Sequence, residues 1–544
     1  MRILLEISAT DHKIWHGLAK RLAEIYPGSK FAAIVGAPPP SDGIFDYLKK
    51  QKDIKYEFLA DLHEILINAF KGEIDHKVLK EFEESLPEKS IWRLVSSDRG
   101  WGAAFMHGAI IPKSFINQNN THENILRVVS GLIKTYRKIF DDFKADIFLP
   151  APCMGSVSVH IYEQICRERG LPYIMPAGIR IKDLFAFASD VQLRFPQISK
   201  TYMDLQYGRI KMDLTEAAGL YDQIMNEFES PRYFDRGNPC FSVTKIDSLY
   251  SKIKFFGGTL KHLAIVASQW PRQRKLYKKG DVFGQPYKLS VFFDNIANVV
   301  KYRYRAYRYR RPGFGEILPA GQKYIYYPLH TSPEYSTQFQ ATMWMDQVYL
   351  IEQLAKSIPF DWVVYVKEHP AIRINRIRPI DFYRRITRFP NVRLAPIDMD
   401  MHKLISNAEM VAVVTGTTGW EAIQRGKPVI GFADNFWDVL GLSCKYTNIE
   451  NLSLDIYNEM CRIKMITREE RKRRIVYYFA AALKQGFKVT HPAQFCYEDG
   501  TDEQYDLAGR EMADALKKYL EYLNTKDRTG KVPRYDDREA QKAI

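Results

Sequence analysis

The sequence is poor in cysteine and contains no long apolar run, and both absences restrict the classes of protein to which it can belong. Its six cysteines are scattered through 544 residues, with no CxxC pair and no histidine at zinc-ligand spacing. No stretch of about 18 apolar residues is present, and the N-terminus enters a strand-like segment without a basic region and cleavage site. We therefore expect a cytoplasmic protein with free thiols.

Several catalytic signatures are also missing. The sequence contains no GxxxxGK[ST] loop, no GxSxG elbow, no HExxH helix, and no GxGxxG after its first strand-like segment. These absences argue against a P-loop NTPase, an α/β hydrolase, a zinc protease and a simple dehydrogenase. We expect no DxD-type metal site either.

Positive charge is in excess. The chain has 79 Lys and Arg residues against 64 Asp and Glu residues, a formal net charge of +15, which predicts attraction to phosphates, anionic lipid or acidic polymers. The segment KYRYRAYRYRR, residues 301–311, interleaves basic residues with tyrosines, and its near alternation predicts a strand with most arginines on one face. Its alternative interpretation is an exposed basic connector between domains.

The order of apolar and amphipathic segments predicts an α/β protein with two doubly wound, Rossmann-like domains. We expect an N-terminal domain over 1–190, a helical and basic connector or insertion over 191–320, a second domain over 321–505, and a C-terminal helix with a charged tail over 506–544. Open parallel sheets bind ligands at the carboxyl ends of their strands, so a ligand is expected in a cleft between the two domains.

The stretch VVTGTTGWEAIQRGKPVIGF, from Val413 to Phe432, reads as a strand, a tight turn, a helix and a second strand. A helix that starts at Thr417 or Thr418 would present backbone N–H groups and hydroxyls to an anion. The alternative is a T-x-x-E capping box, Thr418 to Glu421, which by itself would explain both residues. The candidate donor-binding residues of this stretch are Thr415, Gly416, Thr417, Thr418, Gly419 and Glu421.

Two further motifs follow strand-like segments of the second domain. In VVYVKEHPAIR, Pro370 ends the strand and leaves Lys367 and His369 at its rim, where both can bind phosphate oxygens. In YYPLHTSPEYSTQ, His330 ends a strand and Glu334 lies in the next loop, which reads either as a chemical site or as an ordinary turn with helix-capping residues.

The first domain offers candidates for a general base and for acceptor binding. In RLVSSDRGWGAAF, Asp98 and Arg99 lie in a glycine-flanked loop after the strand-like IWRLVSS. Such a pair is usually a salt bridge, but on a loop that faces a cleft Asp98 is a candidate general base. In AGIRIKDLFAF, Arg180 and Lys182 follow a strand and are candidates for gripping an acceptor.

The three motifs of the second domain, in this order and at these intervals, resemble the bacterial capsule and surface polysaccharide biosynthesis family, which includes the capsular Kdo transferases. The resemblance covers about 320–435 specifically and 1–190 more weakly. It implies a GT-B glycosyltransferase, with the nucleotide-sugar donor held by the C-terminal domain, the acceptor held by the other, and a terminal helix that crosses back. Such enzymes need no bound metal or cofactor.

Bacterial sialyltransferases and related CMP-sugar enzymes share an HP motif and a Ser/Thr-rich turn that contact the donor nucleotide. By that resemblance His369 and Pro370 form the HP motif, and Thr417 with Thr418 form the turn. The acidic base motif of the sialyltransferases has no full match here, because SSDRG supplies one acid only. The implied catalytic residues are Asp98, Glu334 and His369.

We therefore expect a glycosyltransferase that moves a sugar from a nucleotide-sugar donor to a growing surface or capsular polysaccharide or a lipid-linked glycan. One form of this hypothesis has a CMP-linked sugar as the donor. The enzyme would work at the inner face of an anionic membrane, with no role for nucleic acid. Two alternatives stay open: a sugar-nucleotide enzyme resembling UDP-GlcNAc 2-epimerases, and a non-catalytic polyanion- or glycan-binding protein on the same fold.

Overall fold

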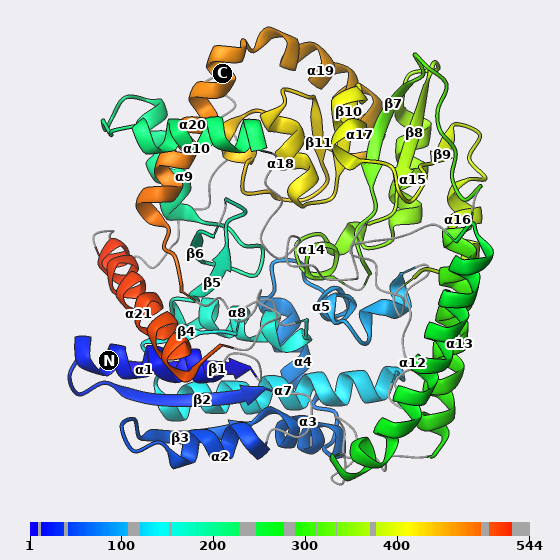
Figure 1. Ribbon diagram of the computed structural model, residues 1–544. Coiled ribbons are helices and arrows are strands. Elements are labelled where there is room, and N and C mark those ends of the chain that lie inside the picture. The colour runs from blue at the N-terminus through cyan, green and yellow to red at the C-terminus, as the bar shows by residue number, and fades with distance from the viewer. Residues whose placement is uncertain are drawn as a thin grey trace.

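The predicted α/β fold class is confirmed by a computed structural model, which contains two separate parallel sheets, one above the other in Figure 1. The model describes residues 1–8, 12–36, 42–106, 120–151, 155–181, 183–227, 246–276, 289–311, 313–332, 334–369, 377–490 and 500–524.

The N-terminal sheet has four parallel strands in the order β3-β2-β1-β4. One of its two central strands, β1, is buried on both faces, and its Ile3, Leu4 and Leu5 are fully buried. The strands are β1 Arg2–Ser8, β2 Lys30–Gly36, β3 Tyr56–Asp61 and β4 Ile147–Leu149. The helices are α1 His12–Ile25, α2 Asp42–Lys50, α3 Leu62–Lys71, α4 His76–Ser85, α5 Ile91–Ser97, η1 Gly102–Phe105, α7 His122–Phe143 and α8 Val157–Arg169.

The C-terminal sheet has six parallel strands in the order β12-β11-β10-β7-β8-β9. The strands are β7 Lys323–Pro328, β8 Trp362–Lys367, β9 Val392–Leu394, β10 Met410–Val413, β11 Val429–Gly431 and β12 Cys444–Lys445. The helices are α14 Tyr335–Gln338, η2 Thr342–Trp344, α15 Gln347–Ser357, α16 Ile380–Ile386, α17 Met401–Asn407, α18 Thr417–Gln424, η4 Asp438–Leu440, η5 Ile449–Asn451, α19 Leu452–Met465 and α20 Arg468–Gln485.

The last described helix, α21 Asp502–Asn524, returns to the N-terminal sheet and packs along α1 (Figure 1). The two helices approach closely because glycines meet at their crossing. A Cβ atom on Gly509 would lie 2.4 Å from the carbonyl oxygen of Ile14, and one on Gly17 would lie 3.0 Å from the backbone of Asp506. Lys20 and Asp506 add an ion pair of 2.8 Å beside this contact.

Between the two sheets, the chain forms a short antiparallel β-hairpin and then helices. The hairpin strands are β5 Met175–Gly178 and β6 Phe185–Ala188, and the helices are α9 Pro196–Gln206, α10 Thr215–Glu227, α12 Leu249–Leu276 and α13 Leu289–Arg310. α9 and α10 pack on α20, whereas α12 and α13 pack on each other. The four segments drawn from the sequence, and the boundaries between them, stay predictions.

Two predicted strands are helices. The Tyr/Arg segment 301–311 lies almost wholly in α13, where Val299, Arg303 and Ala306 are buried at helical spacing, so the apparent alternation is not a strand period. IWRLVSS is the helix α5, because Ile91, Leu94 and Val95 fall on one helical face in the core. In both segments, the side chains that are buried against neighbouring elements recur at helical spacing, and this packing rather than the apparent alternation decides the secondary structure.

No helix within the described ranges is long and apolar enough to cross a membrane.

Candidate functional site

Three neighbouring strands of the C-terminal sheet bring the predicted motifs to one edge. β10 pairs with β7 and β7 pairs with β8, all in parallel, so their carboxyl ends lie side by side. His330 follows β7, His369 follows β8, and the turn Thr415–Gly416 follows β10. The topology therefore places the three motifs as the sequence predicted for a ligand site at strand ends.

His330 is fixed through its backbone by Gln347. Its N–H donates to Oε1 of Gln347 at 2.8 Å, and Nε2 of Gln347 donates back to its carbonyl oxygen at 3.1 Å. The imidazole is buried, and burial lowers the pKa of His330 to about 4. Its Nε2 has no hydrogen-bond partner in the described structure. A buried polar atom without a partner is costly in the unliganded protein and is available to a ligand.

The imidazole of His330 lies against the turn after β10. A Cβ atom on Gly416 would be 3.4 Å from Cε1 of His330, and Gly416 has φ 108°, a conformation that side-chain-bearing residues rarely adopt. Thr415, the preceding residue, is also buried, and its Oγ1 has no hydrogen-bond partner among the described residues. Two buried polar atoms without partners, the imidazole Nε2 and this hydroxyl, therefore belong to residues that adjoin one glycine.

The helix after this turn starts without a side-chain cap. α18 begins at Thr417, as predicted, and its N-cap is Gly416. The capping-box interpretation of Thr418 and Glu421 is wrong, because Thr418 is already inside the helix and no side chain caps the described N-terminus. Glu421 instead lies near His402, with Oε2 3.9 Å from Nδ1, and burial raises the pKa of Glu421 to about 7.

Glu334 lies beside the imidazole of His330. Its Oε2 lies 3.9 Å from Nδ1 of His330. Burial acts to raise the pKa of Glu334, but the neighbouring His369 and His330, together with the nearby hydroxyls of Ser336 and Thr331, outweigh it, and the pKa is lower than usual. The pKa of His369 is lowered by burial, against the opposing effect of Glu334 and Glu368. At neutral pH, an ionised carboxylate thus lies beside neutral imidazoles.

A buried ion pair that the sequence reading missed supports this edge. Glu368 accepts hydrogen bonds from Nη1 of Arg378 at 2.5 Å and from the Tyr383 hydroxyl at 2.7 Å, and Nη2 of Arg378 donates to the carbonyl oxygen of His330. Both charged side chains are buried. The sequence did show Glu368 as a charged residue at the end of an apolar strand. Its partner Arg378, ten residues later, belongs to no recognisable motif, so the ion pair could not be predicted.

The predicted donor residue Lys367 is directed elsewhere. Its Nζ donates to the carbonyl oxygen of Ile397 at 3.3 Å, in the loop after β9, which is one strand further from His330. Burial lowers the pKa of Lys367, with Glu368, Asp398 and Asp400 acting in the opposite direction. Pro370, predicted with it, lies outside the described residues.

Asp98, the other candidate base, has its carboxylate occupied by backbone donors. Oδ1 accepts from Gly100 N at 2.7 Å and Trp101 N at 3.1 Å, and Oδ2 accepts from Val157 N at 3.0 Å, at the start of α8. Burial raises the pKa of Asp98. Nε2 of Gln338 donates to its carbonyl oxygen at 3.0 Å, so this loop of the N-terminal domain does meet α14 of the second domain. Because three backbone N–H groups already occupy its carboxylate, Asp98 is a weaker candidate for a general base than Glu334.

The two described acceptor candidates, Arg99 and Arg180, lie in different loops. Arg99 is exposed, and its side chain lies over Gly155, where a Cβ atom would be 2.2 Å from its Cδ. Arg180 is exposed in the β5–β6 turn with φ 61°. Lys182 lies outside the described residues.

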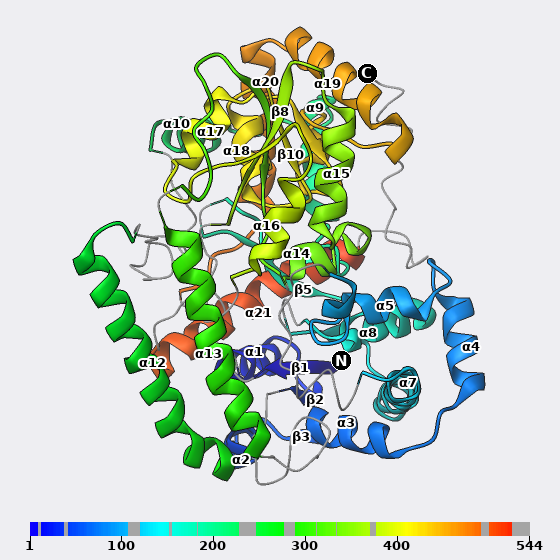
Figure 2. The ribbon, with the colours of Figure 1, turned by 90° about the vertical axis from the view of Figure 1, so that its right-hand side faces the viewer.

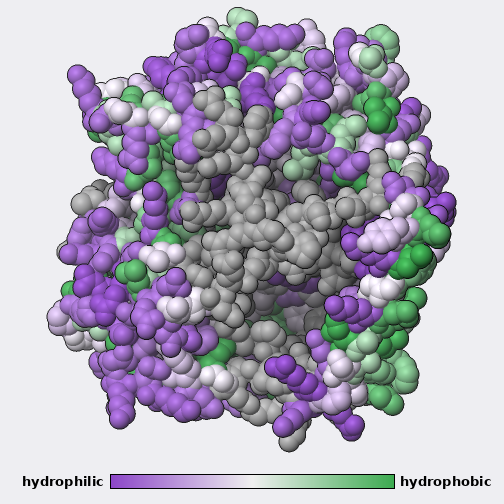
Figure 3. Space-filling view, in the orientation of Figure 1, coloured by the Kyte–Doolittle hydropathy of each residue, from purple (hydrophilic) through white to green (hydrophobic). Residues whose placement is uncertain are grey.

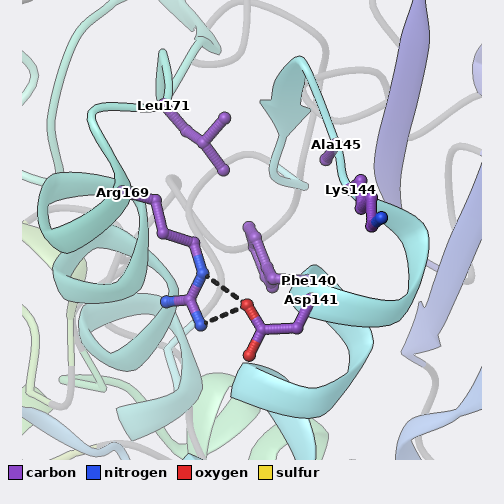
Figure 4. A pocket seen from close by; sticks show the side chains of 6 residues that line it. All are labelled: Phe140, Asp141, Lys144, Ala145, Arg169 and Leu171. Atoms are coloured by element: carbon purple, nitrogen blue, oxygen red, sulfur yellow. Dashed lines mark hydrogen bonds and ion pairs between the residues drawn. The ribbon is translucent and has the colours of Figure 1, made fainter.

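A pocket of about 360 Å³ lies elsewhere, at the amino-terminal edge of the first sheet. Figure 4 shows that Asp141 and Arg169 face each other across it, and Nε and Nη2 of Arg169 donate to Oδ1 of Asp141 at 3.0 and 2.7 Å. Parallel sheets bind ligands at the opposite edge, so this pocket is not the predicted donor site. Within the described ranges, no group of three or more His, Cys, Asp or Glu side chains is placed to hold a metal ion.

Comparison with known proteins identifies one family. Residues 296–455 match the model of the family described as "Capsule polysaccharide biosynthesis protein", which confirms the resemblance drawn from the motifs. No curated protein matches the chain.

Similar solved structures share little sequence with this chain. UDP-GlcNAc 2-epimerase from Neisseria meningitidis is 11% identical, with 97% of this chain and 100% of that chain covered and a TM-score of 0.20. The KpsC beta Kdo 2,4 transferase of Thermosulfurimonas dismutans is 14% identical, with 67% and 87% covered and a TM-score of 0.28. The KpsC beta Kdo 2,7 transferase of that organism is 11% identical, with 71% and 89% covered and a TM-score of 0.30. Identities and TM-scores this low carry no inference about activity.

Proposed function

We propose that this chain, which carries a region of the capsule polysaccharide biosynthesis protein family in residues 296–455, is a glycosyltransferase that uses a nucleotide-sugar donor. The acceptor would be a growing surface polysaccharide or a lipid-linked glycan. The single observation that supports a donor site best is the pair of buried, unpartnered polar atoms, Nε2 of His330 and Oγ1 of Thr415, in residues that adjoin Gly416.

The chemistry follows from where charge would develop. The donor phosphates would accept hydrogen bonds from the first N–H groups of α18 and from the Thr415 hydroxyl, where the helix dipole favours negative charge. When the bond between the sugar and the phosphate breaks, its electron pair goes to the leaving nucleotide, and these donors stabilise that charge. No residue needs to be protonated for this step.

Glu334 would activate the acceptor. Its lowered pKa keeps it ionised at neutral pH, so it can take the proton from an acceptor hydroxyl as that oxygen forms its bond to the anomeric carbon. The neutral imidazoles of His369 and His330 would line the space around this carboxylate and limit its orientation. His369 and Glu334 are the catalytic pair in this proposal, and Asp98 is a residue that positions the loop beside them.

The test of donor binding uses a conservative variant of the turn. We expect one of CMP, UDP, GDP or their sugar conjugates to raise the Tm of the wild type, because a ligand at 100 times its Kd adds about 2.7 kcal/mol of stability. Thr415→Val removes the unpartnered hydroxyl with little change in shape and should weaken that nucleotide about tenfold, measured by isothermal titration.

The matched control is Tyr173→Phe, which also removes a buried hydroxyl without a partner, but in the N-terminal domain. Its nucleotide affinity should equal that of the wild type. If no nucleotide binds, or if both variants bind equally well, the donor site is not at this turn. Sugar transfer and 2-epimerisation are separated by product analysis: a transferase releases free nucleotide and extends a glycan, whereas an epimerase leaves the nucleotide sugar intact.

A further inference from the structure

The helices α12 and α13 form an antiparallel pair on the outside of the molecule, on the left flank in Figure 2. Contacts along the pair fix its register: Ile246 N donates to the carbonyl oxygen of Arg310 at 2.9 Å, and the rings of Trp270 and Phe292 lie 5.2 Å apart near the other end. We call this pair the helical hairpin. One part of it is anchored to the C-terminal domain, where Tyr309 of α13 stacks on Tyr383 of α16 at 5.6 Å.

Arginine holds the two helices together from inside. Nε of Arg303 donates to Oγ1 of Thr259 at 2.8 Å, its Nη2 donates to the carbonyl oxygen of Phe255 at 2.5 Å, and its guanidinium lies 4.0 Å from the centre of the Phe255 ring. Phe255 and Arg303 are both buried. The inner faces of the hairpin are therefore filled by contacts between the two helices, which do not involve the side chains on the outer faces.

The outer face of each helix carries a stripe of large apolar side chains. On α12 the stripe recurs at i, i+4, i+7 and i+11, and on α13 at i, i+4, i+11 and i+15, which places each set along one side of its helix. Their side chains are between 51% and 73% exposed. The residues are Leu249, Ile253, Phe256 and Leu260 on α12, and Leu289, Phe293, Val300 and Tyr304 on α13.

Figure 3 shows hydrophobic side chains gathered over α12 and α13, at its lower right. Soluble surfaces rarely expose contiguous apolar patches of this kind without a partner. The exposed face is therefore a candidate interaction surface.

The charge of the hairpin selects among partners. Asp294 is the only acidic residue in the two helices, whereas basic residues are many: Lys252, Lys254, Lys261, Arg272, Arg274, Lys275, Lys301, Arg303, Arg305, Arg308 and Arg310. Lys254, Lys261 and Lys301 are exposed beside the apolar stripes. A helix surface that combines large apolar side chains with Lys and Arg is typical of segments that lie in the interface of an anionic bilayer.

We infer that the helical hairpin docks on an anionic lipid bilayer, with its apolar side chains among the acyl chains and its lysines at the headgroups. A second copy of the chain fits less well, because a two-fold interface would bring the uncompensated positive charge of one hairpin against the other. This inference does not depend on the proposed function. It would hold the protein at a membrane whether or not the donor site turns over a nucleotide sugar.

The experiment is co-sedimentation of the full chain with vesicles of phosphatidylcholine alone and with vesicles that also contain phosphatidylglycerol. We expect binding to the anionic vesicles only, weakened by salt. The double variant Phe256→Ser and Leu260→Ser, and separately Lys254→Glu and Lys261→Glu, should each bind at least about tenfold more weakly. These side chains are exposed, so circular dichroism and Tm should stay at the wild-type values.

The matched control is Leu454→Ser with Tyr457→Ser on α19, two apolar side chains that are 56% and 65% exposed outside the hairpin. This variant should bind vesicles as the wild type does. The inference is overturned if the wild type ignores anionic vesicles, or if the serine variant of the hairpin binds them unchanged while the glutamate variant does not, since that is charge attraction alone. It is also overturned if light scattering shows a dimer that Phe256→Ser and Leu260→Ser dissociate.

Discussion

Two helices that follow strand ends, α8 in the first domain and α18 in the second, begin in opposite ways. At α8, Ser156 is the N-cap and accepts from Ser158 N at 3.3 Å, while Asp98 reaches from another loop to accept from Val157 N at 3.0 Å. At α18, the N-cap is Gly416, and no side chain takes that role in the described structure. The first helix start is capped by side chains of the protein, whereas the second has no side-chain cap, and it is there that we propose a bound ligand.

This difference separates two acids that look alike in the sequence. Asp98 accepts three backbone hydrogen bonds and so stabilises its own loop, whereas Glu334 is partly exposed beside His330. A carboxylate that accepts several backbone hydrogen bonds mainly stabilises the local fold. A carboxylate that is partly exposed to solvent beside a polar site can instead exchange a proton with a ligand. The following predictions test whether that distinction holds.

The largest effect is expected from Glu334→Gln. Loss of a positioned general base lowers kcat by about 10²–10⁴-fold. Donor affinity, measured by titration, should stay within about twofold of the wild-type value, because the proposed phosphate donors lie on the turn after β10. Asp98→Asn is the counterpart: it should retain most of kcat and lose about 1–3 kcal/mol of unfolding free energy through weakened acceptance from backbone N–H groups. An Asp98→Asn variant that is as stable as the wild type but inactive would show that Asp98, and not Glu334, is the general base.

A smaller effect, on binding, is expected from Gly416→Ala. A side chain at φ 108° is strained, and its Cβ would lie 3.4 Å from His330, so nucleotide affinity should fall by about tenfold and stability by about 1–2 kcal/mol. Gly321→Ala is the matched control, because Gly321 has φ 82° with no atom within 4 Å of a Cβ. It should lose similar stability and no affinity, as measured by thermal unfolding and titration. Equal affinity losses in both variants would attribute the effect to general destabilisation.

The smallest effect concerns a buried acid in the first sheet. Burial raises the pKa of Glu6, on β1, from 4.5 to about 8, with the hydrogen bond from Ala151 N acting in the opposite direction. Folding therefore favours the protonated carboxyl, and the stability it contributes is complete below pH 4.5 and is lost as the pH rises toward 8. Glu6→Gln keeps an acceptor for Ala151 N without a titrating group. In thermal melts at a series of pH values, the Tm of Glu6→Gln minus that of the wild type should increase by a few degrees as the pH rises from 4.5 to 8. A Tm difference that does not change with pH would contradict the raised pKa of Glu6.

The site was predictable to the extent that it is local. His330, His369 and the turn Thr415–Gly416 each follow an apolar strand-like run, and strand ends of one parallel sheet must meet. Arg378 and Gln347 were not predictable, because they act through hydrogen bonds to His330 and Glu368 from positions that carry no motif. The sequence segments of α5 and α13 were predicted as strands because the apolar residues of a short segment can fit both a strand and a helix spacing. The surface against which each segment packs decides between the two.

The sequence by itself determined the alternation of strands and helices, the two α/β domains, the start of α18 at Thr417 and the excess of positive charge. These are properties of short windows and of composition. Only the tertiary structure decided that Asp98 accepts from the start of α8 while Gly416 leaves the start of α18 uncapped, and that the apolar stripes of α12 and α13 face outward. Hydrogen-bond partners and burial depend on which distant segments come together, and the energy of a side chain is set by those neighbours.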